Sequence, residues 1–447
     1  MKAIAKHARA LRGAAHRRCG RYAPVGPLIV LLALTACEHE EIENGFAAAE
    51  IRTGPQRADR GLTVAWNRLA YEVAFAEDEF LTFKGHRAFA MMHLAMHDAL
   101  NSITPVYQRY AYRGERTAAD PTAAAAQAAY EVLVAQYPDV KPRLDAELAA
   151  WLERVSNSTP RTRGIELGKA AAAEMLALRQ GDGFDAQGNY TFRSGAGQYQ
   201  TTPPWNGFVA QPGFRSAKPF ALAEPDQFRP VPPPPLTGEA YALALNEVKD
   251  YGADNSPVRT EDQTAYAVWW MEFSEGSVNR LARQFVTDSR VDLWTANRMF
   301  AYLNMSLFDG YVAVWDAKYE YNHWRPYTAV RAADSDENVG TAPDSNWQPL
   351  RPTPPFPEYS SAHAAGCAAS FEVLEHTFGN GISFTMETIT AASNMRTRSF
   401  TSFAAAAAEC ADSRVRLGWH FRYATESGLA MGRSIARYVM ANFLEGR

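Results

Sequence analysis

The pattern of apolar and polar residues along the chain is that of α-helices. In the first part of the chain apolar side chains recur at spacings of three and four, with many Ala, Leu, Met and Glu residues and few β-branched runs. The helices predicted there span residues 65–80, 86–103, 122–137, 143–155 and 165–180. No convincing alternating strands are found, so the predicted fold class is all-α, with helices packed as bundles.

A long segment without helical periodicity divides the chain. Between about Gly181 and Leu236, Gly, Pro and aromatic residues take over. A connection of this length inside a compact domain is usually functional or wraps the surface. Helical patterns return over residues 238–251, 260–273, 277–288 and 292–319, and no internal repeat is evident.

Composition and charge are those of a folding globular protein. The 447 residues are 47% hydrophobic and 21% charged, which suffices for one large domain or two ordinary ones. The 45 basic and 49 acidic side chains give a net charge of −4 without long blocks of like charge. Bulk electrostatics therefore gives no reason to expect nucleic acid as a partner.

The N-terminus has the features of a targeting segment. Residues 1–21 are rich in Lys, Arg and His, and the apolar run over residues 25–34 is too short to span a bilayer. The run leads into Leu-Thr-Ala-Cys, ending at Cys37, which resembles the lipobox of bacterial lipoproteins. That resemblance implies lipidation of Cys37 and an exported protein anchored to a membrane by lipid alone, periplasmic or on the cell surface. The alternative is a simple signal peptide with an incidental cysteine.

The expected organisation follows from this processing. We expect a signal peptide over residues 1–36, a polar and acidic tether over 37–61 and a helical domain over 62–447. Only Cys367 and Cys410 would then remain in the folded body. An exported location allows a bridge between them, and two separately buried thiols are at least as compatible with the sequence.

Three short segments in the last third of the chain carry the candidate chemistry, and the first spans residues 318–326. Lys318 and Arg325 lie seven positions apart, so a continuing helix would place them two turns apart on one face. Pro326 disfavours helical geometry at Arg325, which suggests that the helix ends there with the guanidinium free to point across a pocket. The alternative is a solvated helix face.

The second segment, residues 360–363, follows a Pro-rich loop and begins a strongly helical stretch at Ser360 or Ser361. Serine is a preferred N-cap, and a helix N-terminus offers N–H groups and a positive dipole end to an anion. His363 would lie in the first turn, beside anything bound there. The alternative is a capped helix with an exposed histidine.

The third segment, residues 413–420, follows an Ala-rich helix and contains Gly418, a common stop signal. Arg414 would end one helix and His420 would begin the next, so both could face one cavity. The alternative for His420 is a packing or surface histidine.

Together the three segments resemble a known signature. The first segment has Lys, six residues and Arg-Pro, the second has Ser-x-His, and the third has Ser-Arg, five residues and His. This set of motifs is similar to the signature shared by vanadium-dependent haloperoxidases and type 2 phosphatidic acid phosphatases. The order and the internal spacing match in each segment. The resemblance to bacterial haloperoxidase-type proteins covers roughly residues 62–445 and includes residues 86–101, 227–230, 247–249, 259–263 and 324–329.

This resemblance implies that the site holds a tetrahedral oxyanion, either vanadate or phosphate. Side-chain cations, a hydroxyl and a backbone N–H would bind its oxygens through charge-assisted hydrogen bonds. The implied binding residues are Lys318, Arg325, Ser361, Ala362, His363, Arg414 and His420.

The catalytic residues implied by the resemblance are His420, His363 and Lys318. His420 would bind the central atom, as a nitrogen ligand to vanadium or as the nucleophile of a phosphatase. His363 would be the general acid–base, and Lys318 would polarise bound peroxide.

The implied reaction is oxidation of halide by hydrogen peroxide with vanadate as cofactor and without haem, followed by halogenation of a small organic substrate. Vanadate and phosphate have nearly the same shape and charge, so a phosphomonoesterase of the acid phosphatase type, with a histidine nucleophile, is the main alternative. The long haloperoxidase-like N-terminal half, without multiple membrane spans, favours the first. A non-catalytic oxyanion-binding lipoprotein is a third possibility.

Two positions depart from the family pattern. Ala362 stands where the family usually has Gly, and its methyl group narrows the approach of the backbone to the oxyanion. Ala424 stands where an Asp commonly orients the histidine four residues before it. We therefore expect His420 to be less basic and its tautomer less controlled. Glu426 is near in sequence but on a different face of the helix from His420.

A histidine cluster in the first part of the chain offers a second candidate site. His86, His93 and His97, with Asp98, lie on one helical face and could bind a metal. The neighbouring methionines favour a buried, packed helix instead. Aromatic residues flank the signature and are candidates for an apolar wall, although structural packing is the commoner role: Trp324, Phe356, Tyr359, Trp419 and Phe421.

Overall fold

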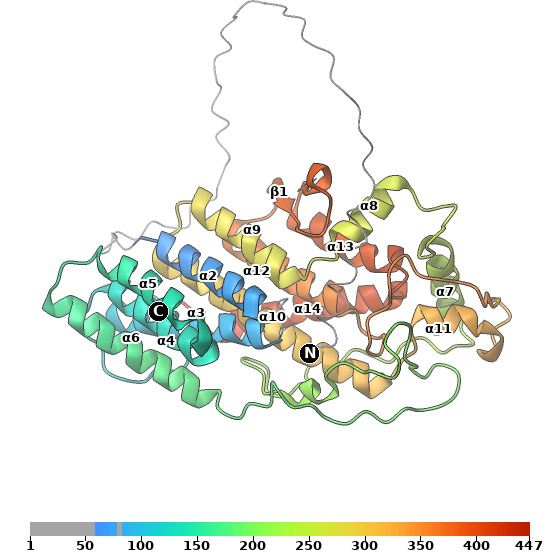
Figure 1. The fold of residues 1–447 in the computed structure, drawn as a ribbon, viewed down its shortest axis with the longest axis horizontal. Helices are drawn as coiled ribbons and strands as arrows, with labels where there is room; N and C mark the ends of the chain where they lie inside the picture. The colour runs from blue at the N-terminus through green and yellow to red at the C-terminus, as the bar shows by residue number, and fades with distance from the viewer. Residues whose placement is uncertain (1–58, 78–82) are drawn as a thin grey trace, which may run out of the picture. The chain divides into compact units, whose positions relative to one another are not determined.

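The computed structural model describes residues 59–77 and 83–447, and all of these belong to one compact unit, Thr53–Arg447 (Figure 1). The predicted signal peptide, Cys37 and the tether up to residue 58 lie outside the described residues. Within the described part, no helix combines the length and the apolar character needed to cross a bilayer.

The helices predicted from the apolar spacing of the first part are confirmed. They are α2 (Gly61–Glu77), α3 (Phe83–Ile103), α4 (Pro121–Gln136), α5 (Lys141–Leu152) and α6 (Thr159–Leu178). Local signals set their starts. Asp120 caps α4 by accepting from the Ala123 N–H at 2.9 Å, directly before a proline at the first helical position.

The remaining helices carry the signature segments. They are α7 (Glu239–Tyr251), α8 (Glu261–Trp269), α9 (Ser274–Asp288), α10 (Leu293–Tyr321), α11 (Pro326–Arg331), α12 (Ala362–Phe378), α13 (Phe403–Arg416) and α14 (Arg422–Asn442). The expectation that one helix reaches Arg325 is wrong. Asn322, with φ of 50°, closes α10, and Arg325 is instead the N-cap of the short helix α11.

The expectation that the chain has no strands is also wrong, although the all-α fold class is confirmed. Two four-residue strands, β1 (Phe384–Glu387) and β2 (Thr397–Phe400), pair antiparallel with Phe384 opposite Phe400. Alternate residues of β1 are buried. Strands of this length carry too few alternations to stand out in the sequence.

The long helix α10 occupies the centre of the fold, in contact with α2, α3, α9, α12 and α14 (Figure 1). Helices α12 and α14, which both contact α10, also pack against each other at very short range. A Cβ atom on Gly428 of α14 would lie 2.5 Å from the carbonyl oxygen of Ser361. A Cβ atom on Gly432 would lie 2.1 Å from the carbonyl oxygen of Ala365. These glycines therefore allow α14 to pass directly under the start of α12, where the second signature segment lies.

The predicted long connection is confirmed, since no α-helix occurs between Leu178 and Glu239. A buried carboxylate on α10 anchors it. Asp309 accepts hydrogen bonds from the backbone N–H groups of Phe220, Ala221 and Leu222 at 2.6, 2.7 and 3.1 Å. Burial raises the pKa of Asp309 to about 6.

The histidines of α3 do not form a metal site in the structure. His86 pairs with Glu275 at 2.9 Å, His93 lies between Asn67 and Asn297, and His97 contacts the carbonyl oxygen of Gln108. Among the described residues, no group of three or more possible metal ligands lies close together on this helix. These side chains therefore serve the buried polar core. Asp98 instead accepts from the backbone N–H groups of residues 110–112.

Candidate active site

The Pro-rich loop over residues 354–361 forms one wall of the site. Lys318, on α10, points its ammonium group into this loop. It donates to three carbonyl oxygens, at 3.1 Å for Pro357, 2.9 Å for Glu358 and 2.5 Å for Ser360. Lys318 therefore fixes the loop, and a hydrogen bond from it to an oxyanion requires one of these bonds to give way.

Arg325 is fully buried at the centre of the site. Its Nε donates to the carbonyl oxygen of Phe356 at 2.8 Å, and its Nη1 donates to that of Trp419 at 2.8 Å. Nη2 has no hydrogen-bond partner among the residues that the structure describes. Because a buried donor without an acceptor is costly, Nη2 is the atom best placed to bind an anionic ligand.

His420 is hydrogen-bonded at both ring nitrogens. Nδ1 lies 2.7 Å from Oε1 of Glu358, which also accepts from the Phe421 N–H at 3.0 Å. Nε2 lies 3.1 Å from Nη1 of Arg325. Because arginine can only donate, this network assigns the proton to Nδ1 and the lone pair to Nε2. His420 thus has its unprotonated nitrogen on the side of the cations, and binding of a ligand atom to Nε2 requires the contact with Arg325 Nη1 to give way.

Glu358 corrects the expectation that His420 lacks an orienting carboxylate. Ala424 offers no carboxylate and Glu426 is exposed, as the sequence suggested, but Glu358 reaches His420 from the other side. Glu358 was not among the residues predicted from the sequence. Its only signal was an acidic side chain three positions before Ser361 in an otherwise apolar, Pro-rich loop.

The start of α12 has the geometry predicted for an anion site. Ser361 is the N-cap, and its Oγ accepts from the Ala364 N–H at 3.4 Å. Ala362 and His363 follow as the first two helical residues, whose N–H groups have no acceptor within the helix. These N–H groups and the positive end of the helix dipole can together bind an anion.

His363 is held neutral beside this helix start. Burial lowers its pKa well below the usual value and Arg414 lowers it further, while carbonyl oxygens of Trp270 and Glu272 raise it. Its Nε2 has no hydrogen-bond partner within the described part of the chain. His363 therefore has a ring nitrogen available for proton exchange with a ligand.

Arg414 ends α13 as predicted, and backbone and hydroxyl groups hold it in place. Its Nε donates to Ser413 Oγ at 2.9 Å and its Nη2 to the Trp270 carbonyl oxygen at 2.7 Å. Burial lowers the pKa of Arg414 to about 9 and that of Arg325 to about 10. Both remain charged at neutral pH.

The electrostatics of His420 show that the three segments converge. Burial is the largest cause that lowers the pKa of His420 well below its usual value. Four of the predicted site residues lower it further through their charges, namely Arg325, Lys318, Arg414 and His363. Glu358 carries the opposite charge, so burial raises its pKa, to about 7, whereas the charges of Arg325 and Lys318 lower it. The pocket therefore favours a bound anion.

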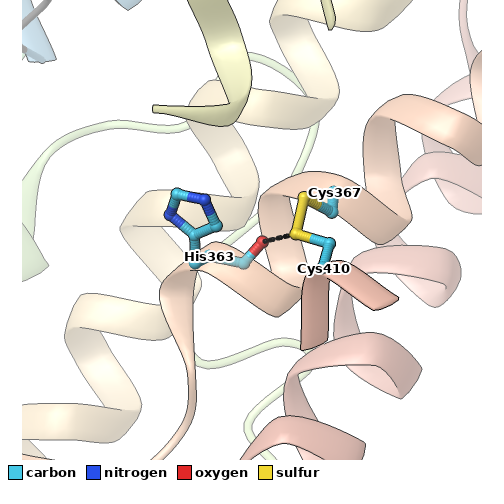
Figure 2. Close-up of side chains that lie close together, drawn as sticks. All are labelled: His363, Cys367 and Cys410. Carbon is cyan, nitrogen blue, oxygen red and sulfur yellow. Dashed lines mark hydrogen bonds between the residues drawn. A yellow bond between two sulfur atoms is a disulfide. The ribbon is translucent and has the colours of Figure 1, made fainter. Parts of the chain in front are cut away.

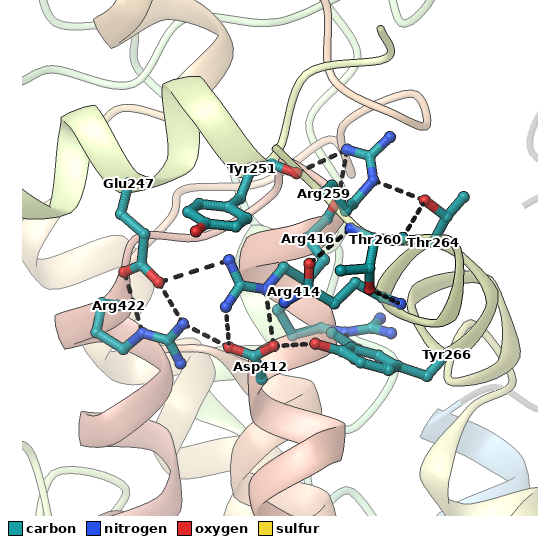
Figure 3. Close-up of polar contacts among 12 residues, drawn as sticks. Glu247, Tyr251, Arg259, Thr260, Thr264, Tyr266, Asp412, Arg414, Arg416 and Arg422 are labelled. Carbon is teal, nitrogen blue, oxygen red and sulfur yellow. Dashed lines mark hydrogen bonds and ion pairs between the residues drawn. The ribbon is translucent and has the colours of Figure 1, made fainter. Parts of the chain in front are cut away.

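A surface-facing ion-pair network holds the helix ends that carry the third segment (Figure 3). Asp412, on α13, accepts from Arg416 Nε at 2.8 Å and also from Tyr266 of α8 and Arg422 of α14. Glu247, on α7, accepts from Arg422 Nε at 3.1 Å. The network ties both helices to α7 and α8, so it restrains the turn between them.

Two of the flanking aromatic residues lie against the buried cations. The Phe356 ring centroid lies 5.1 Å from Lys318 Nζ and 4.9 Å from the guanidinium carbon of Arg325. The Trp419 ring centroid lies 5.2 Å from the guanidinium carbon of Arg414. The others have packing roles: Trp324 and Phe421 join a separate apolar cluster, and the Tyr359 hydroxyl donates to the Val231 carbonyl oxygen.

The chain is similar to known proteins in sequence. Residues 298–445 match the family described as the VCPO second helical-bundle domain. Vanadium chloroperoxidase of Curvularia inaequalis is 24% identical over 377 residues, covering 66% of this chain and 61% of that protein. The chain therefore spans about three fifths of the length of this curated relative. The chain is therefore similar in sequence to vanadium chloroperoxidase, and the family match lies within residues 298–445.

Solved structures show the same fold. The first bacterial vanadium-dependent iodoperoxidase structure matches with a TM-score of 0.73 at 23% identity, covering 88% of this chain and 98% of that one. The holo form of a bacterial vanadium-dependent chloroperoxidase matches with a TM-score of 0.63 at 17% identity, covering 80% and 92%. The likeness in fold therefore extends well beyond residues 298–445.

Proposed function

We propose that this chain is a vanadate-dependent haloperoxidase that oxidises halide with hydrogen peroxide. The observation that carries the proposal is the state of His420, whose Nε2 lone pair faces a pocket of buried cations while Glu358 holds Nδ1. A nitrogen lone pair and a cationic pocket suit an oxyanion with a metal centre.

The residues present fit vanadate. His420 Nε2 would bind the vanadium, and the free Nη2 of Arg325 would donate to an oxygen. The charges of Lys318 and Arg414 and the N–H groups at the start of α12 would neutralise the remaining negative charge. When bound, vanadate activates hydrogen peroxide toward attack by halide.

The protein's own residues hold protons and exclude water. The carboxyl group of Glu358 keeps the His420 proton on Nδ1, so Nε2 stays a ligand atom. His363, neutral and with Nε2 unpartnered among the described residues, would take up and return a proton during turnover. Phe356 covers the cations and strengthens their attraction for the anion by keeping water away.

The same lone pair would also serve as the nucleophile of a phosphatase, which makes that activity the competing proposal. One preparation of the full chain should be assayed for halogenation of a phenol dye with vanadate, peroxide and each halide, and for p-nitrophenyl phosphate hydrolysis. We expect halogenation, its loss in His420→Ala, and no loss in the surface control Glu426→Gln. Hydrolysis without halogenation would overturn the proposal in favour of a phosphatase, and vanadate binding without either reaction would indicate a non-catalytic protein.

We also propose that the chain is an exported lipoprotein, since Cys37 ends a lipobox-like sequence. Replacement of Cys37 by Ala should release the protein from the membrane fraction. An unchanged distribution would contradict anchoring through this residue.

A further inference from the structure

A cysteine pair lies directly behind the acid–base histidine (Figure 2). Cys367, on α12, forms a disulfide with Cys410, on α13, which resolves the two alternatives left by the sequence. A ring nitrogen of His363 and both sulfur atoms all lie within 4.8 Å of one another. Both cysteines are fully buried. Cys410 Sγ lies 3.8 Å from the His363 carbonyl oxygen, a contact rather than a hydrogen bond because a disulfide sulfur carries no proton.

These three side chains are metal ligands once the bridge is reduced. Two thiolates and an imidazole form a zinc ligand set, with bonds of about 2.3 Å to sulfur and about 2.0 Å to nitrogen. His363 and Cys367 are four positions apart on α12, so they share one helical face. Once the S–S bond is broken, the two sulfur atoms need only move apart to leave room for an ion.

The helices would keep the ligands together without the bridge. Phe371 of α12 and Phe403 of α13 stack with ring centroids 6.1 Å apart. Asp412 also ties α13 to Tyr266 of α8 and Arg422 of α14, and α14 packs against α12. The reduced protein therefore retains a preformed pocket for the ion, which lowers the ordering cost of binding.

We propose that the reduced chain binds Zn²⁺ through His363, Cys367 and Cys410, and that peroxide releases the metal by forming the disulfide. Bound zinc would occupy the imidazole and turn it away from the oxyanion site. The proposed control of activity by zinc depends on the proposed haloperoxidase function, whereas the proposed zinc site does not depend on it.

The releasing step balances. Two zinc-bound thiolates, one hydrogen peroxide and two protons give the disulfide, two waters and free Zn²⁺. The S–S bond forms as the O–O bond breaks, the two sulfur atoms lose two electrons in total, and the peroxide oxygens gain them. The oxidant is the substrate of the proposed reaction, so the enzyme would be switched on by the compound that it consumes.

Metal binding is tested without any activity assay. The full chain is reduced, freed of reductant without air and titrated with Zn²⁺ against a chromogenic chelator, and with Co²⁺ for its thiolate charge-transfer absorption. We expect one metal per reduced chain and none per oxidised chain. The oxidised wild type has the same sequence and serves as the control, so the result does not depend on a variant.

Variants assign the ligands. Cys367→Ser combined with Cys410→Ser should abolish binding, and His363→Gln should weaken it at least tenfold. His376→Gln, at the other end of α12, should leave it unchanged. A reduced chain that takes up no zinc, or a double-serine variant that still binds it, would overturn the proposal.

The effect on activity is measured separately. Halogenation by the zinc-loaded chain should begin with a lag that shortens as peroxide is increased, and the oxidised chain should show no lag. A chain that binds zinc but never halogenates would overturn the proposed function and leave the metal site standing. Halogenation without a lag by a zinc-loaded chain would overturn the switch.

Discussion

At the scale of single residues, the pairing of Glu358 with His420 decides which ring nitrogen faces the ligand. Replacing Glu358 by Gln keeps the size of the side chain but removes the carboxylate that accepts from Nδ1. Changes to a group that orients a metal-binding histidine typically cost about 10–100-fold in metal affinity or activity. We therefore expect Glu358→Gln to lower vanadate affinity and halogenation by this order, as measured by calorimetry and steady-state kinetics.

The matched control is Glu426→Gln, which removes a carboxylate of the same type from an exposed position on α14. It should leave both measurements within error of the wild type. Equal effects of the two substitutions would mean that Glu358 acts only through the net charge of the protein.

The raised pKa of Glu358 predicts how anion binding depends on pH. Burial raises this pKa to about 7, so below that pH the carboxyl group is neutral and the buried cations are less compensated. For an anion that makes no bond to His420, affinity should fall as the pH rises through about 7, by roughly tenfold or more. Sulfate is the suitable probe because it stays a dianion across this range.

The dependence should disappear in Glu358→Gln, which cannot ionise. A wild-type profile that is flat, or one that persists unchanged in the variant, would show that another group controls anion binding.

The sequence sufficed to locate the signature residues but not their partners. Spacing within one short segment is local, so Ser361 could be predicted as a helix cap and Arg414 as the end of a helix. Glu358 and His420 are separated by 62 positions, and their contact depends on how the loop and α14 meet. The use of all three Lys318 donors by backbone carbonyls likewise depends on tertiary packing.

At the scale of elements, the close approach of α12 and α14 can be tested at Gly428. A Cβ atom there would lie 2.5 Å from the Ser361 carbonyl oxygen, so the helices must separate in Gly428→Ala. Overpacking of this kind costs about 1–3 kcal/mol. The denaturant midpoint should fall accordingly, and sulfate affinity should fall as well because the start of α12 moves.

Gly310→Ala is the control, since no heavy atom lies within 4 Å of its Cβ position in the interior of α10. This variant should be unchanged or more stable by up to about 1 kcal/mol. A loss of stability at Gly310 equal to that at Gly428 would rule out helix separation as the cause.

Helices were predictable where the apolar period runs for several turns, as in α3 and α10. The apolar pattern placed the end of α10 at residue 319, two residues short, but not its closure by Asn322, whose left-handed conformation asparagine tolerates but does not require. Strands β1 and β2 were missed for a related reason. Their pairing joins two short segments, and only the partner makes either one a strand.

At the scale of the whole molecule, three buried cations gathered in one site should make folding stability depend on a bound anion. Burial lowers the pKa of Lys318, Arg325 and Arg414, which expresses the cost of keeping their charges out of water. An anion that binds only the folded chain stabilises it by about 2.7 kcal/mol at a hundred times its Kd. Vanadate or sulfate at that excess should therefore raise the Tm by several degrees in a thermal scan.

The size of this increase should depend on Arg325, which has the unpartnered donor, and not on surface arginines. Arg325→Ala should lose most of the anion-induced rise in Tm, whatever its Tm without anion. Arg437→Ala removes an arginine whose side chain is 68% exposed and should keep the full rise. If both variants respond like the wild type, the anion acts as a general stabilising salt, because excluded ions strengthen burial without occupying a site.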